Sequence, residues 1–196
     1  MKTELINLNE NMTISVAEDT QFVLDVVDGV EEKALTFELL FEKEGVSAEI
    51  ISLNNIGAGH SINLTTITKH LVPNTACITT VKSVLNDNSK STFIGKIIIN
   101  SKASQTSSFL YDHVLVVGEN TKNNSQPILQ IDTDDVKASH GATTGRVDKD
   151  QLFYLTSRGL SLREAEQLLV EGFFESLLNK IIDDKVRAKI AERVKL

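Results

Sequence analysis

The sequence contains one cysteine, Cys77, and this scarcity of thiols excludes several kinds of site. A single cysteine cannot form an intrachain disulfide, a Cys-x-x-Cys redox pair or a zinc site built on several thiolates. Cys77 lies in a strand-like run, where the simplest interpretation is a small buried hydrophobic residue. Few cysteines are typical of a cytoplasmic protein, so we expect a cytoplasmic location.

Long apolar runs are also missing. The N-terminal segment lacks the run of about seven apolar residues that a signal peptide needs. No segment approaches the roughly 20 apolar residues of a membrane span. We therefore expect neither a signal peptide nor insertion into a membrane.

Nucleotide-binding and hydrolase motifs are absent from the chain. It has no GxxxxGK[ST] phosphate loop, no GxGxxG fingerprint, no GxSxG and no HExxH. Its net charge of -7 argues against nucleic-acid binding, which requires clustered Lys and Arg to neutralise phosphates. The chain by itself is predicted to bind no nucleotide and no nucleic acid.

What the sequence does contain is a long strand-rich section. The chain has 196 residues, of which 41% are hydrophobic and 24% charged, as expected for about one folded domain. From about residue 12 to residue 131, short runs rich in Thr, Ile and Val alternate with polar turns, and several runs have an apolar period of two. Strands without intervening helices predict a sandwich, a barrel or a parallel β-solenoid, and the pattern alone leaves all three open.

A helical tail follows the strands. Asp148 and Ser161 are predicted to cap two helices, with Glu164 at the capping-box position of the second. A third helix would bury Val186, Ile190 and Val194 on one side. The second helix is expected to bury one apolar stripe, made of Leu162, Ala165, Leu168, Leu169, Gly172, Phe173 and Leu177. We divide the chain into a strand domain, residues 1–146, and a helical domain, residues 147–196.

Histidines are the best candidates for metal ligands in a chain with one thiol. His60 and His70 lie in or beside strands without acidic or thiol partners nearby in sequence, so we interpret them as surface or hydrogen-bonded core residues. His113 and His140 are better candidates. Imidazole binds iron or zinc, but further ligands would have to come from elsewhere in the fold or from another subunit.

Two stretches resemble a known family. Residues 134–173, "DDVKASHGATTGRVDKDQLFYLTSRGLSLREAEQLLVEGF", are similar to the C-terminal signature of the SufB/SufD family of iron-sulfur cluster assembly proteins. Residues 70–99, "HLVPNTACITTVKSVLNDNSKSTFIGKIII", resemble the core of the same family. The resemblance implies a mainly β fold, a right-handed parallel β-helix (β-solenoid) followed by a small C-terminal α-helical domain.

The resemblance also implies a function. Family members are not enzymes by themselves; they act as scaffolds, pair with one another as dimers, and bind the ABC-type ATPase SufC through the C-terminal helices. It implies a transient iron or iron-sulfur cluster, shared with a partner, for which His140 and His113 are the candidate ligands. The implied contacts with a SufC-like ATPase are Gln151, Tyr154, Arg158 and Glu171.

Departures from the family pattern shape the prediction. Ala138 stands where some members have cysteine, and Gly141 stands where SufB-type members often have glutamate, so the chain is SufD-like. Two alternatives stay open at this point. The chain could be a structural adaptor without a cluster ligand, or a β-solenoid enzyme acting on carbohydrate, although neither clustered carboxylates nor a six-residue repeat is present.

Overall fold

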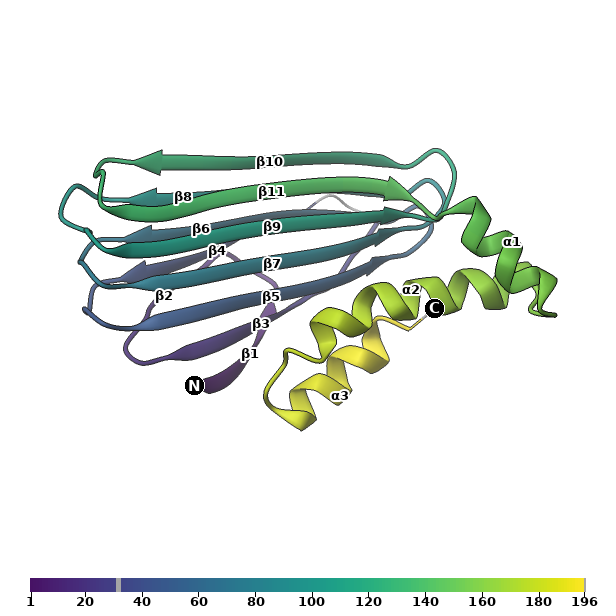
Figure 1. Cartoon of the computed structure of the whole chain (residues 1–196), viewed down its shortest axis with the longest axis horizontal. Helices are drawn as coiled ribbons and strands as arrows, with labels where there is room; N and C mark the ends of the chain where they lie inside the picture. Colours follow the sequence, from purple (N-terminus) through teal and green to yellow (C-terminus); the bar gives the residue numbers. More distant parts are fainter. Residues whose placement is uncertain (31–32, 196) are drawn as a thin grey trace.

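The computed structural model describes residues 1–30 and 33–195, which form a parallel β-solenoid followed by three helices (Figure 1). Sheet A has the strand order β1-β3-β5-β7-β9-β11 and sheet B the order β10-β8-β6-β4-β2. The strands are β1 (Lys2–Leu8), β2 (Met12–Ser15), β3 (Thr20–Val26), β4 (Ala34–Phe41), β5 (Ser47–Ile56), β6 (Ser61–His70), β7 (Ala76–Leu85), β8 (Lys90–Ile99), β9 (Thr106–Val116), β10 (Lys122–Ile131) and β11 (Val136–Arg146).

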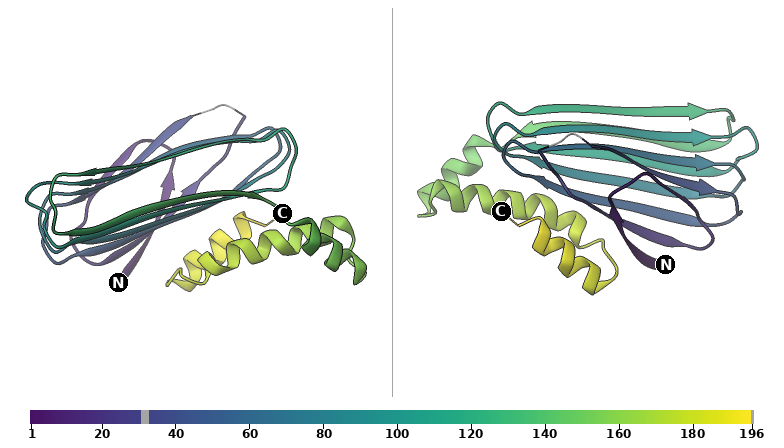
Figure 2. Two further views of the ribbon diagram at one scale, coloured as in Figure 1. Left: turned by 45° about the horizontal axis from the view of Figure 1, so that its top comes forward. Right: turned by 180° about the vertical axis from the view of Figure 1, so that it is seen from behind.

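Consecutive strands alternate between the two sheets, and neighbours within each sheet are parallel. Equivalent residues therefore stack in columns: Cys77 pairs with Ala48 on one side and with Ser108 on the other. The left view of Figure 2 shows the coils stacked as flattened loops, with the helices outside one sheet. This arrangement confirms the predicted solenoid, and the sandwich and the barrel are excluded.

Period-two alternation builds the interior. Inward-facing side chains of both sheets form one apolar cluster along the axis, which includes Phe22, Phe37, Ile50, Leu64 and Phe93. Stacking extends beyond residues 12–131, in which the alternating runs occur: β1 and β11 lie outside that range but within the predicted strand domain, residues 1–146. The sequence of β11, "VKASHGATTGR", lacks apolar alternation.

His70 and Cys77 are interior residues, as predicted. The His70 ring stacks on Phe41 at 4.3 Å, and its nitrogens share hydrogen bonds with the hydroxyls of Thr75 (2.8 Å) and Ser108 (3.1 Å). Burial lowers the pKa of His70 to about 4, so the ring is neutral at physiological pH. Burial also raises the pKa of the Cys77 thiol to about 12, which removes it as a thiolate donor.

The helices are α1 (Lys149–Ser157), α2 (Leu162–Leu178) and α3 (Asp184–Arg193). Asp148 caps α1 and Ser161 forms a capping box with Glu164, both as predicted. The predicted stripe of α2 is partly wrong: Leu162 and Leu168 are exposed. The helix rotates instead to bury Ala165, Val170, Phe174 and Leu177. Within residues 1–30 and 33–195, no helix is long and apolar enough to cross a membrane.

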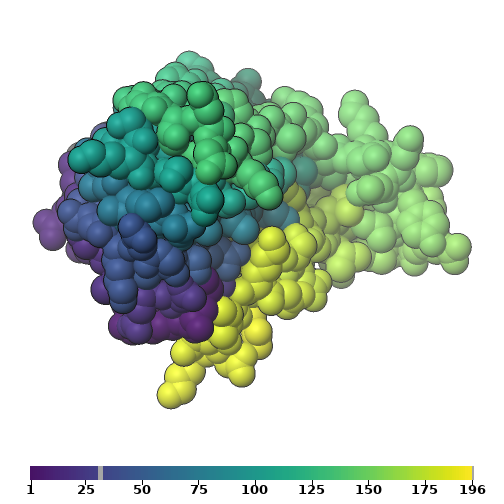
Figure 3. Space-filling model, turned by 60° about the vertical axis from the view of Figure 1, so that its left-hand side comes forward, coloured from purple at the N-terminus to yellow at the C-terminus, as the bar shows by residue number. Residues whose placement is uncertain are grey.

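A second apolar cluster joins α2 and α3 to the outer face of sheet A. Val23, Ile51, Leu53 and Val84 of the sheet pack against a helical set made of Val170, Phe174, Leu177, Ile181, Ile190 and Val194. Figure 3 shows α3, in yellow, against the purple and blue first strands, while the light green region of α1 projects from the body. The prediction that Val186, Ile190 and Val194 share the inner side of the third helix is confirmed.

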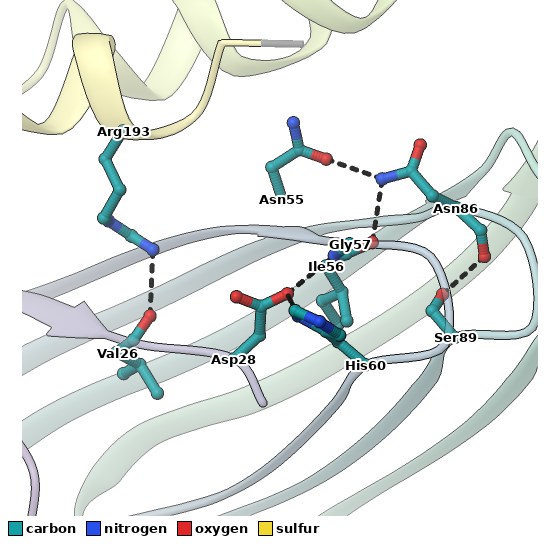
Figure 4. A network of polar contacts seen from close by, with 9 residues as sticks. All are labelled: Val26, Asp28, Asn55, Ile56, Gly57, His60, Asn86, Ser89 and Arg193. Carbon is teal, nitrogen blue, oxygen red and sulfur yellow. Dashed lines mark hydrogen bonds and ion pairs between the residues drawn. The ribbon is translucent and has the colours of Figure 1, made fainter. Parts of the chain in front are cut away.

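Arg193 anchors the end of α3 to the sheet. Its guanidinium donates to the carbonyl oxygen of Val26 at 2.9 Å (Figure 4). It also donates to the carbonyl oxygen of Leu53 and lies 2.8 Å from a carboxylate oxygen of the buried Asp25. Lys189 reaches the other Asp25 oxygen at 3.3 Å. The buried carboxylate is thereby paired with two cations, and the helical tail is held at the first strands of the solenoid.

The helix–sheet cluster yields a stability prediction. Phe174→Ala removes a side chain that is 1% exposed, so the free energy of unfolding should fall by about 3–5 kcal/mol through lost burial and a residual cavity. Leu168→Ala, on the same helix but 48% exposed, should change it by about 0.5 kcal/mol or less. Denaturant unfolding followed by circular dichroism compares the two. Equal losses would contradict the assigned orientation of α2.

Candidate functional site

The last coil leaves one end of the solenoid uncovered. β11 is the final strand of sheet A and β10 the final strand of sheet B, so neither has a neighbour on its outer edge among the described residues. Asn123 on β10 donates a 2.9 Å hydrogen bond to the Thr144 hydroxyl on β11, which links the two strands across the coil. The open end (the inward-facing side of this coil) consists of Asn123, Ser125, Pro127 and Leu129 on β10 and Ala138, His140, Ala142 and Thr144 on β11.

His140 lies at the middle of this open end. It pairs in register with Leu110, whose side chain is buried in the interior, so the imidazole is on the inward-facing side of β11. With no further coil above it, the residue is exposed. An accessible imidazole on the rim of an unfinished coil can bind a metal ion, provided that other molecules supply most of the ligands.

His113, the other predicted ligand, lies on the opposite side of sheet A. It pairs with Thr143, and its Nδ1 shares a 2.9 Å hydrogen bond with the Thr143 hydroxyl. The ring is nearly parallel to that of Tyr111, and partial burial together with the nearby Lys82 ammonium lowers its pKa. The structure therefore does not bring His113 and His140 together on one face of the chain.

No group of three or more His, Cys, Asp or Glu side chains suited to a metal ion occurs in the described parts of the chain. A metal bound here would need ligands from outside the chain. His60, far from the open end, pairs with Asp28 at 3.1 Å on the surface, in agreement with its predicted structural role (Figure 4).

Asp112 is a polar residue of the site that was not predicted. It lies on β9, directly beneath Ala142 of β11, and is 1% exposed. Neither carboxylate oxygen has a hydrogen-bond partner among the described residues. Burial raises the pKa of Asp112 to about 6, and the Ser125 hydroxyl offsets part of that rise. A buried carboxylate without a cation is costly, so this residue requires an explanation.

A signal for Asp112 was present in the sequence. Along "SSFLYDHVLVV", the inward positions of β9 include Ser108, Leu110, Asp112 and Val114. Asp112 is therefore the single acid among these inward-facing residues of β9. Without the strand register, the inward and outward faces of β9 could not be told apart, and Asp112 could equally have been a solvated residue.

Three of the four predicted partner contacts lie together on α1 and its C-cap. Gln151 and Tyr154 line a hollow of about 380 Å³ with Asp150, Leu155 and Leu169. The Arg158 guanidinium lies 5.3 Å from the centre of the Tyr154 ring. Glu171 is separate: it lines a different hollow, between α2 and α3, and accepts a 3.0 Å hydrogen bond from Gln167.

The α1 helix buries none of its own residues. Phe153 is 74% exposed and Tyr154 58% exposed, while Leu162 and Leu168 nearby on α2 are also uncovered. We call these four residues the α1 apolar surface. Large apolar side chains exposed on two helices that pack together are candidates for an interaction site, and sequence reasoning had placed the two leucines in the core.

The unpaired carboxylate yields a pH prediction. The pKa of Asp112 in the folded chain, about 6, exceeds the ordinary 3.8 of an aspartate. The protonated carboxyl group therefore favours the folded state at low pH. This contribution to stability is lost as the pH rises from about 4 through 6. Asp112→Asn should therefore gain about 2–3 kcal/mol relative to the wild type between pH 4 and pH 8. Thermal or urea unfolding at both pH values measures this gain. A difference that is independent of pH would contradict the burial of an unpaired charge.

Comparison with known proteins agrees with this architecture. Residues 5–173 match the family model "SUF system FeS cluster assembly, SufBD core domain". The chain is 33% identical over 113 residues to the iron-sulfur cluster assembly protein SufD of Escherichia coli (strain K12), covering 58% of this chain and 27% of that protein. It is 30% identical over 175 residues to an iron-sulfur cluster assembly SufBD family protein of Mycobacterium leprae, covering 85% and 45%.

A third relative is the SufD protein of Bacillus subtilis (strain 168), at 38% identity over 107 residues, covering 55% of this chain and 24% of that protein. The matches span less than half the length of these relatives. The family model nevertheless covers the solenoid and the first part of the helical tail, including the open end and most of α2. The chain belongs to the SufBD family of iron-sulfur cluster assembly proteins.

Proposed function

We propose that this chain is a scaffold subunit of an iron-sulfur cluster assembly complex and has no enzymatic activity by itself. In the proposal it pairs through the open end of its solenoid with a second copy or a SufB-like chain, and it binds a SufC-like ATPase through α1 and α2. The observation that carries the proposal is the uncovered last coil, with an exposed histidine on its inward-facing side.

Edge-strand chemistry supports pairing at the open end. The outer edges of β10 and β11 carry backbone N–H and C=O groups without a neighbouring strand, and such edges associate readily with another chain. Ala138 and Ala142, which flank His140 on the same face of β11, have small side chains, which leaves room for a partner to approach. A partner stacked there would complete the coil and enclose His140, where iron or sulfide could be held between the two chains.

The helical tail supports the assignment of the ATPase partner. The α1 apolar surface is uncovered, and Gln151 and Arg158 lie beside Tyr154, which belongs to it. Only Val147 and Asp148 separate the end of β11 from the start of α1. A movement of α1 driven by ATP hydrolysis in the partner would therefore be transmitted to β11, and so to the interface, as a rigid-body displacement.

A second candidate function is a structural adaptor that contributes no ligand. The burial of Cys77 favours it, because the chain's one thiol is inaccessible and protonated. Anaerobic reconstitution with the partner chains separates the two functions. His140→Ala should reduce the bound iron and sulfide in the scaffold role and leave them unchanged in the adaptor role.

The α1 surface yields a binding prediction. Phe153→Ala combined with Tyr154→Ala should weaken binding to the ABC-type ATPase at least tenfold, because aromatic anchors dominate interfaces of this kind. Ile78→Ala removes an apolar side chain that is also exposed, 41%, but lies on sheet A, and it should leave binding unchanged. Calorimetry with the purified ATPase measures both. If the two variants bind alike, α1 is not the docking surface.

Adjacent residues of β11 provide a matched test of pairing. Thr144→Lys places a charged side chain on the open end, whereas Gly145→Lys places one on the outer face, where nothing lies within 4 Å of an added Cβ. Thr144→Lys should weaken association with a second copy or a SufB-like chain at least tenfold, and Gly145→Lys should not. Light scattering across a concentration series gives both values. Equal effects would contradict pairing through the open end.

A further inference from the structure

In the part of the chain that the structure describes, Asp112 is the one carboxylate buried in the interior next to the open end. Its inward-facing position is fixed by the register of β9, where Leu110 and Val114, two residues away on either side, belong to the interior apolar cluster. The Ser125 hydroxyl on β10 lies close enough to the Asp112 carboxylate to lower its pKa, although neither its oxygen nor the carboxylate oxygens make a hydrogen bond of normal geometry among the described residues, and no cation pairs with Asp112 there. Asp25, the comparable buried acid near the other end, is paired with Arg193 and Lys189. Among the described residues, Asp112 therefore has no paired cation, whereas Asp25 has two.

The register places Asp112 and His140 on the same face. Asp112 pairs with Ala142, and His140 precedes Ala142 by two residues on β11. Adjacent strands lie about 4.8 Å apart and two residues span about 6.6 Å, which puts the two Cα atoms roughly 8 Å from each other. That separation allows one ion to contact both side chains. The residues that cover Asp112 on the side of the open end, Ala142 and Ser125, have small side chains.

We propose that Asp112 is the second ligand that this chain provides, with His140, for ferrous iron entering the open end. The inference rests on the proposed scaffold function and adds to it a residue for the metal. One carboxylate oxygen and one imidazole nitrogen form a donor pair that suits Fe(II). The remaining ligands come from sulfide or from the partner chain, since the described residues place no third His, Cys, Asp or Glu beside this pair.

This assignment replaces His113 as the companion of His140. His113 faces the outside of sheet A, where its Nδ1 already shares a hydrogen bond with Thr143. Asp112, in contrast, has free oxygens and lies on the inward-facing side. The carboxylate turns toward the open end by rotation about its side-chain bonds when iron arrives, and the iron then neutralises a charge that is otherwise buried and unpaired.

The test is anaerobic titration of the full chain with ferrous iron alone, in competition with a chromophoric chelator. Asp112→Asn keeps the shape of the side chain and removes its charge, and His140→Ala removes the imidazole. Each should weaken iron binding at least tenfold. His113→Ala and Asp132→Asn, an exposed carboxylate in the loop before β11, serve as matched controls and should bind as the wild type does. Circular dichroism and thermal melting verify that every variant is folded.

The outcomes separate this inference from the proposed function. If His140→Ala weakens binding and Asp112→Asn does not, the inference is wrong and the scaffold function stands. If the wild type binds iron no more tightly than any variant, the iron site itself is wrong. If Asp112→Asn impairs only the association of two chains and leaves iron binding intact, the missing cation is a basic side chain of the partner, and the assignment of iron is overturned.

Discussion

Parallel stacking of successive coils is the constraint on which the rest of the structure depends. Each strand satisfies its backbone hydrogen bonds with the strands before and after it in the same sheet, so a coil is complete only when it has neighbours on both sides. The period of two then sends one set of side chains into the interior and the other set outward. The outward set of sheet A provides Val23, Ile51, Leu53 and Val84 as the surface on which the helices pack.

The same constraint concentrates chemistry at the end of the stack. Interior polar residues such as His70 are sealed by coils on both sides and find partners in Thr75 and Ser108. In the last coil the interior positions remain, but no layer covers them, so His140 is exposed. Asp112, on the neighbouring strand β9, is covered by β11 but has no cation beside it among the described residues. Because β11 continues almost directly into α1, the end of the stack is also the part of the solenoid to which the helical tail is covalently joined.

Local chemistry made much of this fold predictable, and tertiary context decided the rest. The cap residues Asp148 and Ser161 were identifiable because capping depends on a few neighbouring atoms. β11 was placed in the strand domain only by the family resemblance and its position before the helices, since it lacks apolar alternation and is ordered here by its pairing with β9. The burial of α2 was mispredicted for a related reason: the helix has apolar residues around much of its circumference, and only the shape of sheet A selects Phe174 over Leu168.

Candidate ligands in a solenoid must therefore be judged by the face on which they lie as well as by residue type. Adjacent residues of a strand point to opposite faces, and Asp112 and His113 are adjacent: one enters the interior and the other faces the outer surface. By the same rule, His140 lies on the same face of sheet A as Asp112 and on the opposite face from His113, although sequence alone does not distinguish the two histidines. A buried carboxylate can destabilise the free chain and still be tolerated if a cation binds it when the protein functions, because strain and unsatisfied charge persist where binding relieves them. The destabilising charge lies directly next to the end coil, where an incoming partner or ion can reach it.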